Sequence, residues 1–180
     1  ESQSPDRGLP QGQAATPRPA ADWATITGHE RMLLGGDPVY SLRQLAREAG
    51  TSLSFAHKFW RAMGFADVQP DEVRFTDQDV AALQDTVALL DETSDSSLAS
   101  ASVLELLRAQ SYTMDRLVLW ELETFVMDLS ERLGLDDTAA RLVALDRIDG
   151  LVELLSRQLT YVWRRHMASI LGRTDAEVST

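Results

Sequence analysis

The chain has 180 residues, 44% hydrophobic and 25% charged, so it is long enough to form one sizeable hydrophobic core. Its formal charge of −11 and isoelectric point near 4.6 oppose a general affinity for nucleic acid, which depends on basic residues that displace counterions. Cysteine is absent, which excludes disulfides and thiolate chemistry, and no apolar run reaches the roughly 20 residues of a membrane-spanning helix. Composition therefore predicts a cytoplasmic globular protein.

Residues 1–29 are expected to form a disordered tail or linker. Prolines are concentrated there among Gln, Ala and Ser, with almost nothing apolar to bury. Residues 30–173 are expected to form one all-α domain, because no alternating strand pattern of useful length appears.

The stretch YSLRQLAREAGTSLSFAHKFWRAMGF (40–65) predicts a helix-turn-helix-like unit. Ser41 is a suitable N-cap for a helix to about Ala49, and Gly50 suits the left-handed residue that ends it. A second short helix is then expected to run to about Met63.

The second of these helices carries a basic face. His57, Lys58 and Arg61 are spaced so that they lie on one side, as in a DNA-recognition helix. Two interpretations follow: the face binds DNA, or it docks on acidic helices of its own chain or of a partner. The acidic chain and the lack of a second basic element favour docking.

Three further helices are expected at 76–91, 98–133 and 138–171. Thr76 is a good N-cap for the first, and 98–133 contains neither Gly nor Pro. The last segment is interrupted at most near Gly150.

Within that last helix, apolar residues recur at alternating spacings of four and three, which is typical of a coiled-coil seam. The expected seam consists of Ile148, Val152, Leu155, Leu159 and Val162, and His166 continues the pattern. A partner helix is implied, so the long helices are expected to form a dimeric bundle.

The end of the seam is a candidate sensor. Histidine is the side chain that changes charge between about pH 5 and 8. A protonated His166 would place a charge on a packed seam beside Trp163, Arg164 and Arg165. The alternative is a core histidine with one satisfied hydrogen bond.

We do not expect this chain alone to catalyse a reaction. Its three histidines are too scattered for a zinc site, and it has no Gly-rich phosphate loop and no nucleophile elbow. We therefore expect no metal, no cofactor and no catalytic residue. One binding alternative stays open, in which an apolar ligand or lipid occupies a pocket lined by Met114, Val118, Trp120 and Phe125.

Over roughly residues 30–173 the chain resembles the N-terminal regulatory domain of actinobacterial class III adenylate cyclases. Five motifs carry the resemblance in order: LLGGDPVYSLRQLAREAG, FWRAMGFADV, VRFTDQDVAAL, QSYTMDRLVLWE and YVWRRHMASIL. The family more often has Gly immediately before the residue that matches Gln110. This chain has Ala109 at that position.

The resemblance implies a non-catalytic homodimeric domain that precedes a cyclase domain in the same polypeptide. Such a domain controls synthesis of cAMP from ATP by positioning the catalytic domains, autoinhibition included, in response to pH or a fatty acid. Residues 174–180 would begin the linker to the catalytic domain. The rival function is a dimeric helix-turn-helix transcriptional regulator, and the second rival is the apolar-ligand module.

Overall fold

The computed structural model describes residues 28–90, 95 and 97–178. Most of the predicted tail (1–27) and much of the polar break before the long helices (91–94 and 96) lie outside the described residues. The all-α prediction is confirmed. The elements are β1 (Tyr40–Ser41), α2 (Leu42–Glu48), α3 (Leu53–Ala62), β2 (Val73–Phe75), α4 (Asp77–Ala88), α5 (Ser100–Leu133) and α6 (Asp137–Val178).

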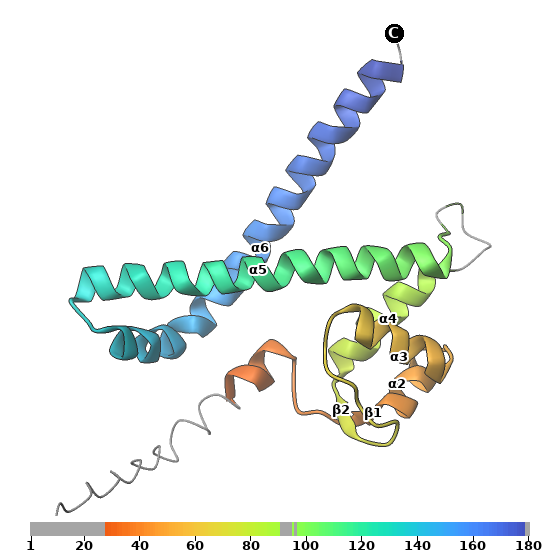
Figure 1. Ribbon diagram of the computed structural model, residues 1–180, viewed down its shortest axis with the longest axis horizontal. Helices are drawn as coiled ribbons and strands as arrows, with labels where there is room; N and C mark the ends of the chain where they lie inside the picture. The colour runs from red at the N-terminus through yellow and green to blue at the C-terminus, as the bar shows by residue number, and fades with distance from the viewer. Residues whose placement is uncertain (1–27, 91–94, 96, 179–180) are drawn as a thin grey trace, which may run out of the picture.

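Helices α2, α3 and α4 form a compact N-terminal module together with the small antiparallel sheet β1–β2 (Figure 1). The sheet is an addition to the predicted elements, with Tyr40 opposite Phe75 in its register. Side chains from all these elements meet in one apolar cluster, in which Leu45, Ala56 and Phe75 are fully buried.

The helix ends follow their sequence signals. Ser41 caps α2: its Oγ accepts from the Gln44 N–H at 3.3 Å, and the Gln44 side chain accepts from the Ser41 N–H at 2.8 Å. Thr76 caps α4 in a similar way, with its N–H donating to Asp79 Oδ2 at 2.7 Å. Each cap satisfies N–H groups that a helix start leaves without partners.

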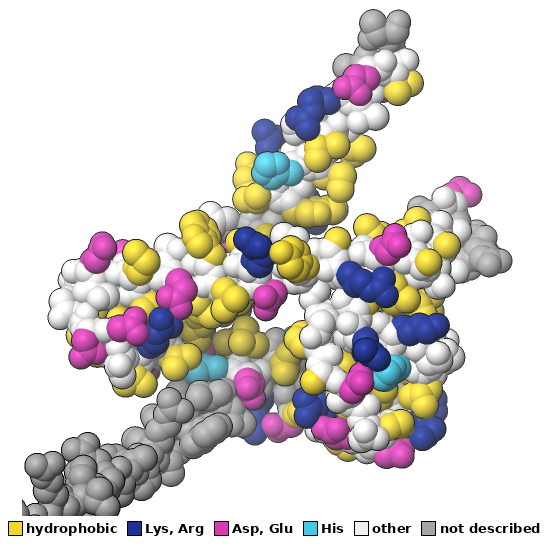
Figure 2. Space-filling model, viewed as in Figure 1, with side chains coloured by type: hydrophobic (Ala, Val, Ile, Leu, Met, Phe, Trp, Pro, Cys, Tyr) yellow, Lys and Arg dark blue, Asp and Glu magenta, His cyan; other side chains and the backbone are white. Residues whose placement is uncertain are grey.

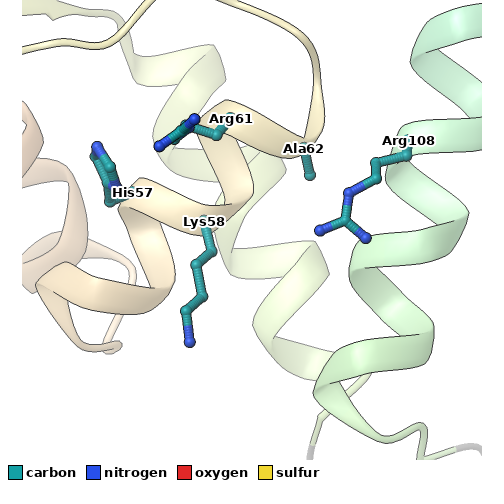
Figure 3. Close-up of a pocket in the computed structure, with 5 residues that line it drawn as sticks. All are labelled: His57, Lys58, Arg61, Ala62 and Arg108. Atoms are coloured by element: carbon teal, nitrogen blue, oxygen red, sulfur yellow. The ribbon is translucent and has the colours of Figure 1, made fainter.

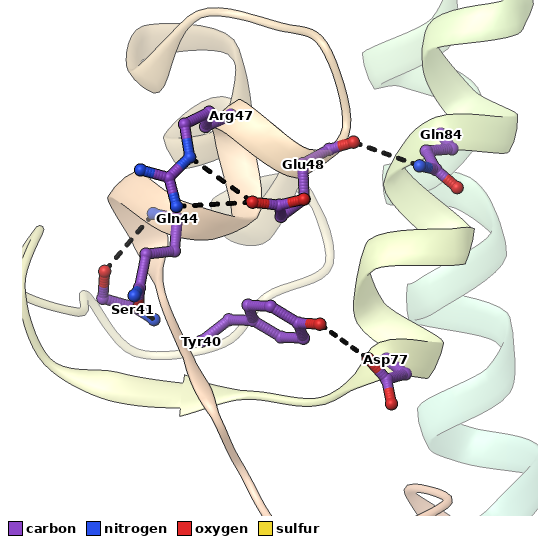
Figure 4. Close-up of polar contacts among 7 residues, drawn as sticks. All are labelled: Tyr40, Ser41, Gln44, Arg47, Glu48, Asp77 and Gln84. Atoms are coloured by element: carbon purple, nitrogen blue, oxygen red, sulfur yellow. Dashed lines mark hydrogen bonds and ion pairs between the residues drawn. The ribbon is translucent and has the colours of Figure 1, made fainter.

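Polar contacts tie β1 and α2 to α4 across the module (Figure 4). The Tyr40 hydroxyl donates to Asp77 Oδ1 at 2.8 Å, which raises the pKa of Tyr40, mainly through this hydrogen bond. The Gln84 side chain donates to the Glu48 carbonyl at 3.1 Å. Both contacts join segments more than 30 residues apart, so they fix the orientation of the module's helices.

Helix α5 connects this module to the rest of the molecule. Near its N-terminal end Leu107 packs against the module's apolar cluster, and the Ser111 hydroxyl donates to the Met63 carbonyl. Near its C-terminal end Val126 and Leu129 join a second, separate cluster with residues of α6. One straight helix therefore belongs to two hydrophobic cores.

Helix α6 turns back from the end of α5, crosses it, and continues until its C-terminal half stands clear of the body (Figure 1). The helix is unbroken at Gly150, which the sequence allowed. It differs from the predicted element at its C-terminal end, because it runs on through Val178 rather than ending near 171. A single Gly costs only about 1 kcal/mol in a helix interior, which a long helix tolerates.

Residues 28–33 form a further short helical segment that contacts α6. His29 Nδ1 lies 2.9 Å from Asp149 Oδ1, while His29 Nε2 is buried with no hydrogen-bond partner among the described residues. His29 was assigned to the tail by sequence reasoning, but the structure attaches it to the long helix. Within the ranges described, no helix combines the length and apolar character that crossing a bilayer requires.

Two glycines of the long helices should respond in opposite ways to Ala. Gly150 is helical, and a Cβ there meets nothing within 4 Å, so Gly150→Ala should raise the free energy of unfolding by about 0.5–1 kcal/mol. Gly134 ends α5 at φ 63°, so Gly134→Ala should lower it by about 1–2 kcal/mol. Urea denaturation followed by circular dichroism measures both, and destabilisation by Gly150→Ala would contradict an unbroken α6.

Candidate functional site

The residues expected to act lie on three surfaces: the seam and C-terminal half of α6, the outer face of α5, and the basic face of α3. The start of α6 is firmly attached to α5, since Ala140 and Ala144 are buried against Val126 and Leu129. This attachment fixes where the seam begins.

An ion-pair network reinforces that attachment. The Arg141 guanidinium donates to both Glu123 carboxylate oxygens, at 3.0 and 3.2 Å, and to Asp137 Oδ2 at 3.0 Å. These contacts, the Glu123 hydrogen bonds first, raise the pKa of Arg141. All three side chains are largely exposed, so the network orients α6 more than it stabilises the fold.

The seam residues change environment along α6. Ile148 is buried, Val152, Leu155 and Leu159 are half-buried, and Val162 is exposed. From Tyr161 onward every α6 side chain that the structure describes is exposed. The protein's own body therefore covers the first part of the seam and leaves the last part uncovered.

The candidate sensor residues lie on the uncovered part. Trp163 is 58% exposed, and Arg164, Arg165 and His166 are exposed as well. None of these four side chains makes a hydrogen bond or an ion pair within the described ranges. His166 is thus on the surface of a single copy of the chain, and only a partner could bury it.

Apolar side chains also line an uncovered face of α5, as Figure 2 illustrates for the side of the molecule that it draws. Four of them, at successive spacings of seven, one and seven residues, are each more than half exposed: Tyr112, Leu119, Trp120 and Met127. Exposed apolar surface on this scale is uncommon on monomeric proteins and typical of interfaces.

The predicted apolar pocket is divided by the structure. Met114 and Val118 line one hollow of about 660 Å³ between α3 and α5, together with Phe65 and Leu119. Trp120 does not line it, and Phe125 packs on the second apolar cluster instead. The two aromatic residues are five positions apart, a spacing that places them on different sides of a helix.

The basic face of α3 is exposed as its spacing predicts, with Ala56, Phe59 and Ala62 pointing into the core. His57, Lys58 and Arg61 line a second hollow, of about 470 Å³, and Arg108 of α5 completes it (Figure 3). Sequence reasoning missed Arg108, because only the packing of α5 against α3 brings it there.

Among the described residues no group of histidine or acidic side chains is arranged to hold a metal ion. The acidic residues at helix starts serve as caps, as with Asp79 on Thr76. The chemistry that these surfaces support is binding: an apolar partner for α5 and α6, and an anionic partner for α3.

No family model matches the chain. An adenylate cyclase from Glutamicibacter nicotianae is 34% identical to it over 167 residues, which make up 93% of this chain and 40% of that protein. Adenylate cyclases from Streptomyces coelicolor and Streptomyces griseus are each 34% identical over 146 residues, 80% of this chain, and it spans 36% and 35% of them. The chain is therefore similar, over most of its length, to a part of actinobacterial adenylate cyclases that is well under half of each protein.

Proposed function

We propose that this chain is the non-catalytic, dimerising and regulatory part of an adenylate cyclase, and that α6 passes its conformational state to catalytic domains in the same polypeptide. The similarity to a part of three adenylate cyclases supports the parent activity. The fold supports a regulatory role, since its described surfaces are suited to binding and hold no metal-ligand cluster.

One observation carries the proposal: the uncovered apolar stripe on the free half of α6. Val162, Trp163, Met167 and Ile170 are 39–58% exposed, and their spacings of one, four and three residues keep them on one side of the helix. An isolated helix is marginally stable in water, and apolar burial supplies most helical stability in proteins. This half of α6 therefore requires a partner.

A second copy of the chain is the partner that we propose. The stripe begins at Val162, the last apolar residue of the predicted seam, and occupies the adjoining side of α6, so two α6 helices can pack against each other along both. The uncovered face of α5 adds apolar area beside it, in keeping with the apolar character of permanent dimer interfaces. In such a dimer, a shift of one α6 against the other changes the relative position of whatever follows both helices.

Dimerisation through the stripe is tested by Trp163→Glu. The wild-type chain should sediment as a dimer, and the variant should dissociate at least about tenfold more readily, because a carboxylate replaces a large apolar contact. Tyr161→Glu is the matched control: Tyr161 is 63% exposed but lies on the opposite side of the helix. Analytical ultracentrifugation measures both. A monomeric wild type, or equal effects of the two variants, would count against the seam.

Regulation by pH is the finer part of the proposal, and His166 is the residue through which we expect it. It lies beside Val162 and Ile170 on the stripe, so a partner helix would bury it and protonation would then add a charge to the interface.

In the longer polypeptide, His166→Gln should therefore flatten the dependence of cAMP formation on pH between about 5.5 and 8. Arg157→Gln, an exposed charge change elsewhere on α6, should leave the profile unchanged. The assay is cAMP produced from ATP, and the 180-residue chain alone should produce none. An unaltered profile in His166→Gln would remove the pH mechanism, while cAMP formation by the short chain would overturn the regulatory assignment.

A second candidate function is binding of an apolar ligand such as a fatty acid, favoured by the hollow that Met114 and Val118 line. Native mass spectrometry of the purified chain should then detect a co-purified apolar molecule, and Val118→Glu should abolish it. Spectra of the wild-type chain without any bound mass would remove this candidate.

A further inference from the structure

We propose that the hollow between α3 and α5 binds a small, multiply charged phosphate anion, of which inorganic diphosphate is the simplest. The hollow is lined by His57, Lys58, Arg61 and Ala62 of α3 and by Arg108 of α5. Four of its five lining residues are basic or titratable to a positive charge, and no carboxylate lines it. The chain as a whole has 28 acidic and 17 basic residues, so this basic cluster is opposite in sign to the net charge.

One carboxylate beside the hollow contacts two of these side chains, the imidazole of His57 and the guanidinium of Arg61. Asp67 Oδ1 lies 3.5 Å from His57 Nε2 and 3.4 Å from Arg61 Nε. Asp67 follows α3 in the turn that the Trp60 indole fixes by donating to the Ala66 carbonyl at 2.8 Å. The Asp67 carboxylate therefore bridges His57 and Arg61 on this side of the hollow.

The other two basic side chains of the hollow are those of Lys58 and Arg108. Within residues 28–90 and 97–178, neither Lys58 nor Arg108 forms an ion pair. Figure 3 shows the Arg108 guanidinium extending from α5 toward α3, across the space beside Ala62 and Lys58. A guanidinium offers paired N–H donors that match phosphate oxygens, and the Lys58 ammonium adds a point charge.

The shape of the site favours a small anion over a nucleic acid. A recognition helix must protrude to enter the major groove, but here α5 flanks α3 and supplies one wall of the hollow. The volume of about 470 Å³ falls in the ~300–1,000 Å³ range of small-molecule pockets. The net negative charge of the chain would repel a long polyanion, while screening beyond about 8 Å leaves the local positive field to act on a small one.

This inference does not depend on the cyclase assignment, because it is tested on the 180-residue chain alone. If that assignment also holds, the anion has an evident source, since cAMP synthesis releases diphosphate from a triphosphate. The regulatory chain would then respond to the product or the substrate of its own polypeptide.

The test is isothermal titration of the chain with inorganic diphosphate, with sulfate and a short DNA duplex as comparison ligands. Diphosphate should bind saturably at one site per chain, and more weakly as salt is raised. Arg108→Gln and Lys58→Gln should each weaken binding about tenfold, the usual effect of losing one charge-assisted contact. Arg74→Gln is the matched control, because it removes an equal charge from β2, away from the hollow.

Three outcomes would overturn the proposal. Sulfate binding as tight as that of diphosphate, or binding to the hollow variants equal to that of the Arg74→Gln control, would leave only nonspecific charge attraction. Duplex DNA that displaces diphosphate from the site would assign the face to nucleic acid instead. Circular dichroism of each variant, unchanged from wild type, ensures that lost binding reflects the removed side chain.

Discussion

Helix α5 is buried at each end against a different set of partners, and the arrangement of every other surface follows from this. Its 34 residues span about 50 Å, with Leu107 on the module's cluster and Leu129 on the α6 cluster. Because each cluster alone is small, neither the module nor the base of α6 has an independent large core. The helix therefore acts as the rigid element that keeps the α3 hollow and the α6 seam at a fixed separation.

Because α5 is rigid, the surfaces that the rest of the molecule leaves uncovered keep fixed positions. The α3–α5 junction gathers cations such as Lys58 and Arg108, while the free half of α6 exposes apolar residues such as Trp163. A monomer gains nothing from either arrangement, since apolar exposure costs free energy and clustered cations repel one another. Both make sense in an assembly in which α6 meets a second copy and the hollow meets an anion.

Local signals in the sequence identified most of the helices, because caps such as Ser41 and Thr76 act within a few residues. The β1–β2 sheet was missed, since strands of two and three residues are too short to alternate visibly. The polar face of α3 could be read from spacing, but Arg108 could not, because its role arises from a contact between helices 50 residues apart. The exposure of the seam residues could not be predicted from the sequence either, because it depends on where α5 crosses α6.

The unbroken path of α6 through Gly150 has a mechanical consequence. From Gly150 to Val178 the helix spans about 40 Å, and from Tyr161 onward every described side chain is exposed, so a bend near Gly150 moves the far end most. A bend of only about 5° at its base displaces the far end by roughly 3.5 Å, about two-thirds of a helical turn. Asp149, whose carboxylate contacts the His29 ring, lies at the start of this segment. A small change in the contact between residues 28–33 and α6 would therefore produce a larger displacement at the C-terminal end of the helix, enough to change which surfaces meet there.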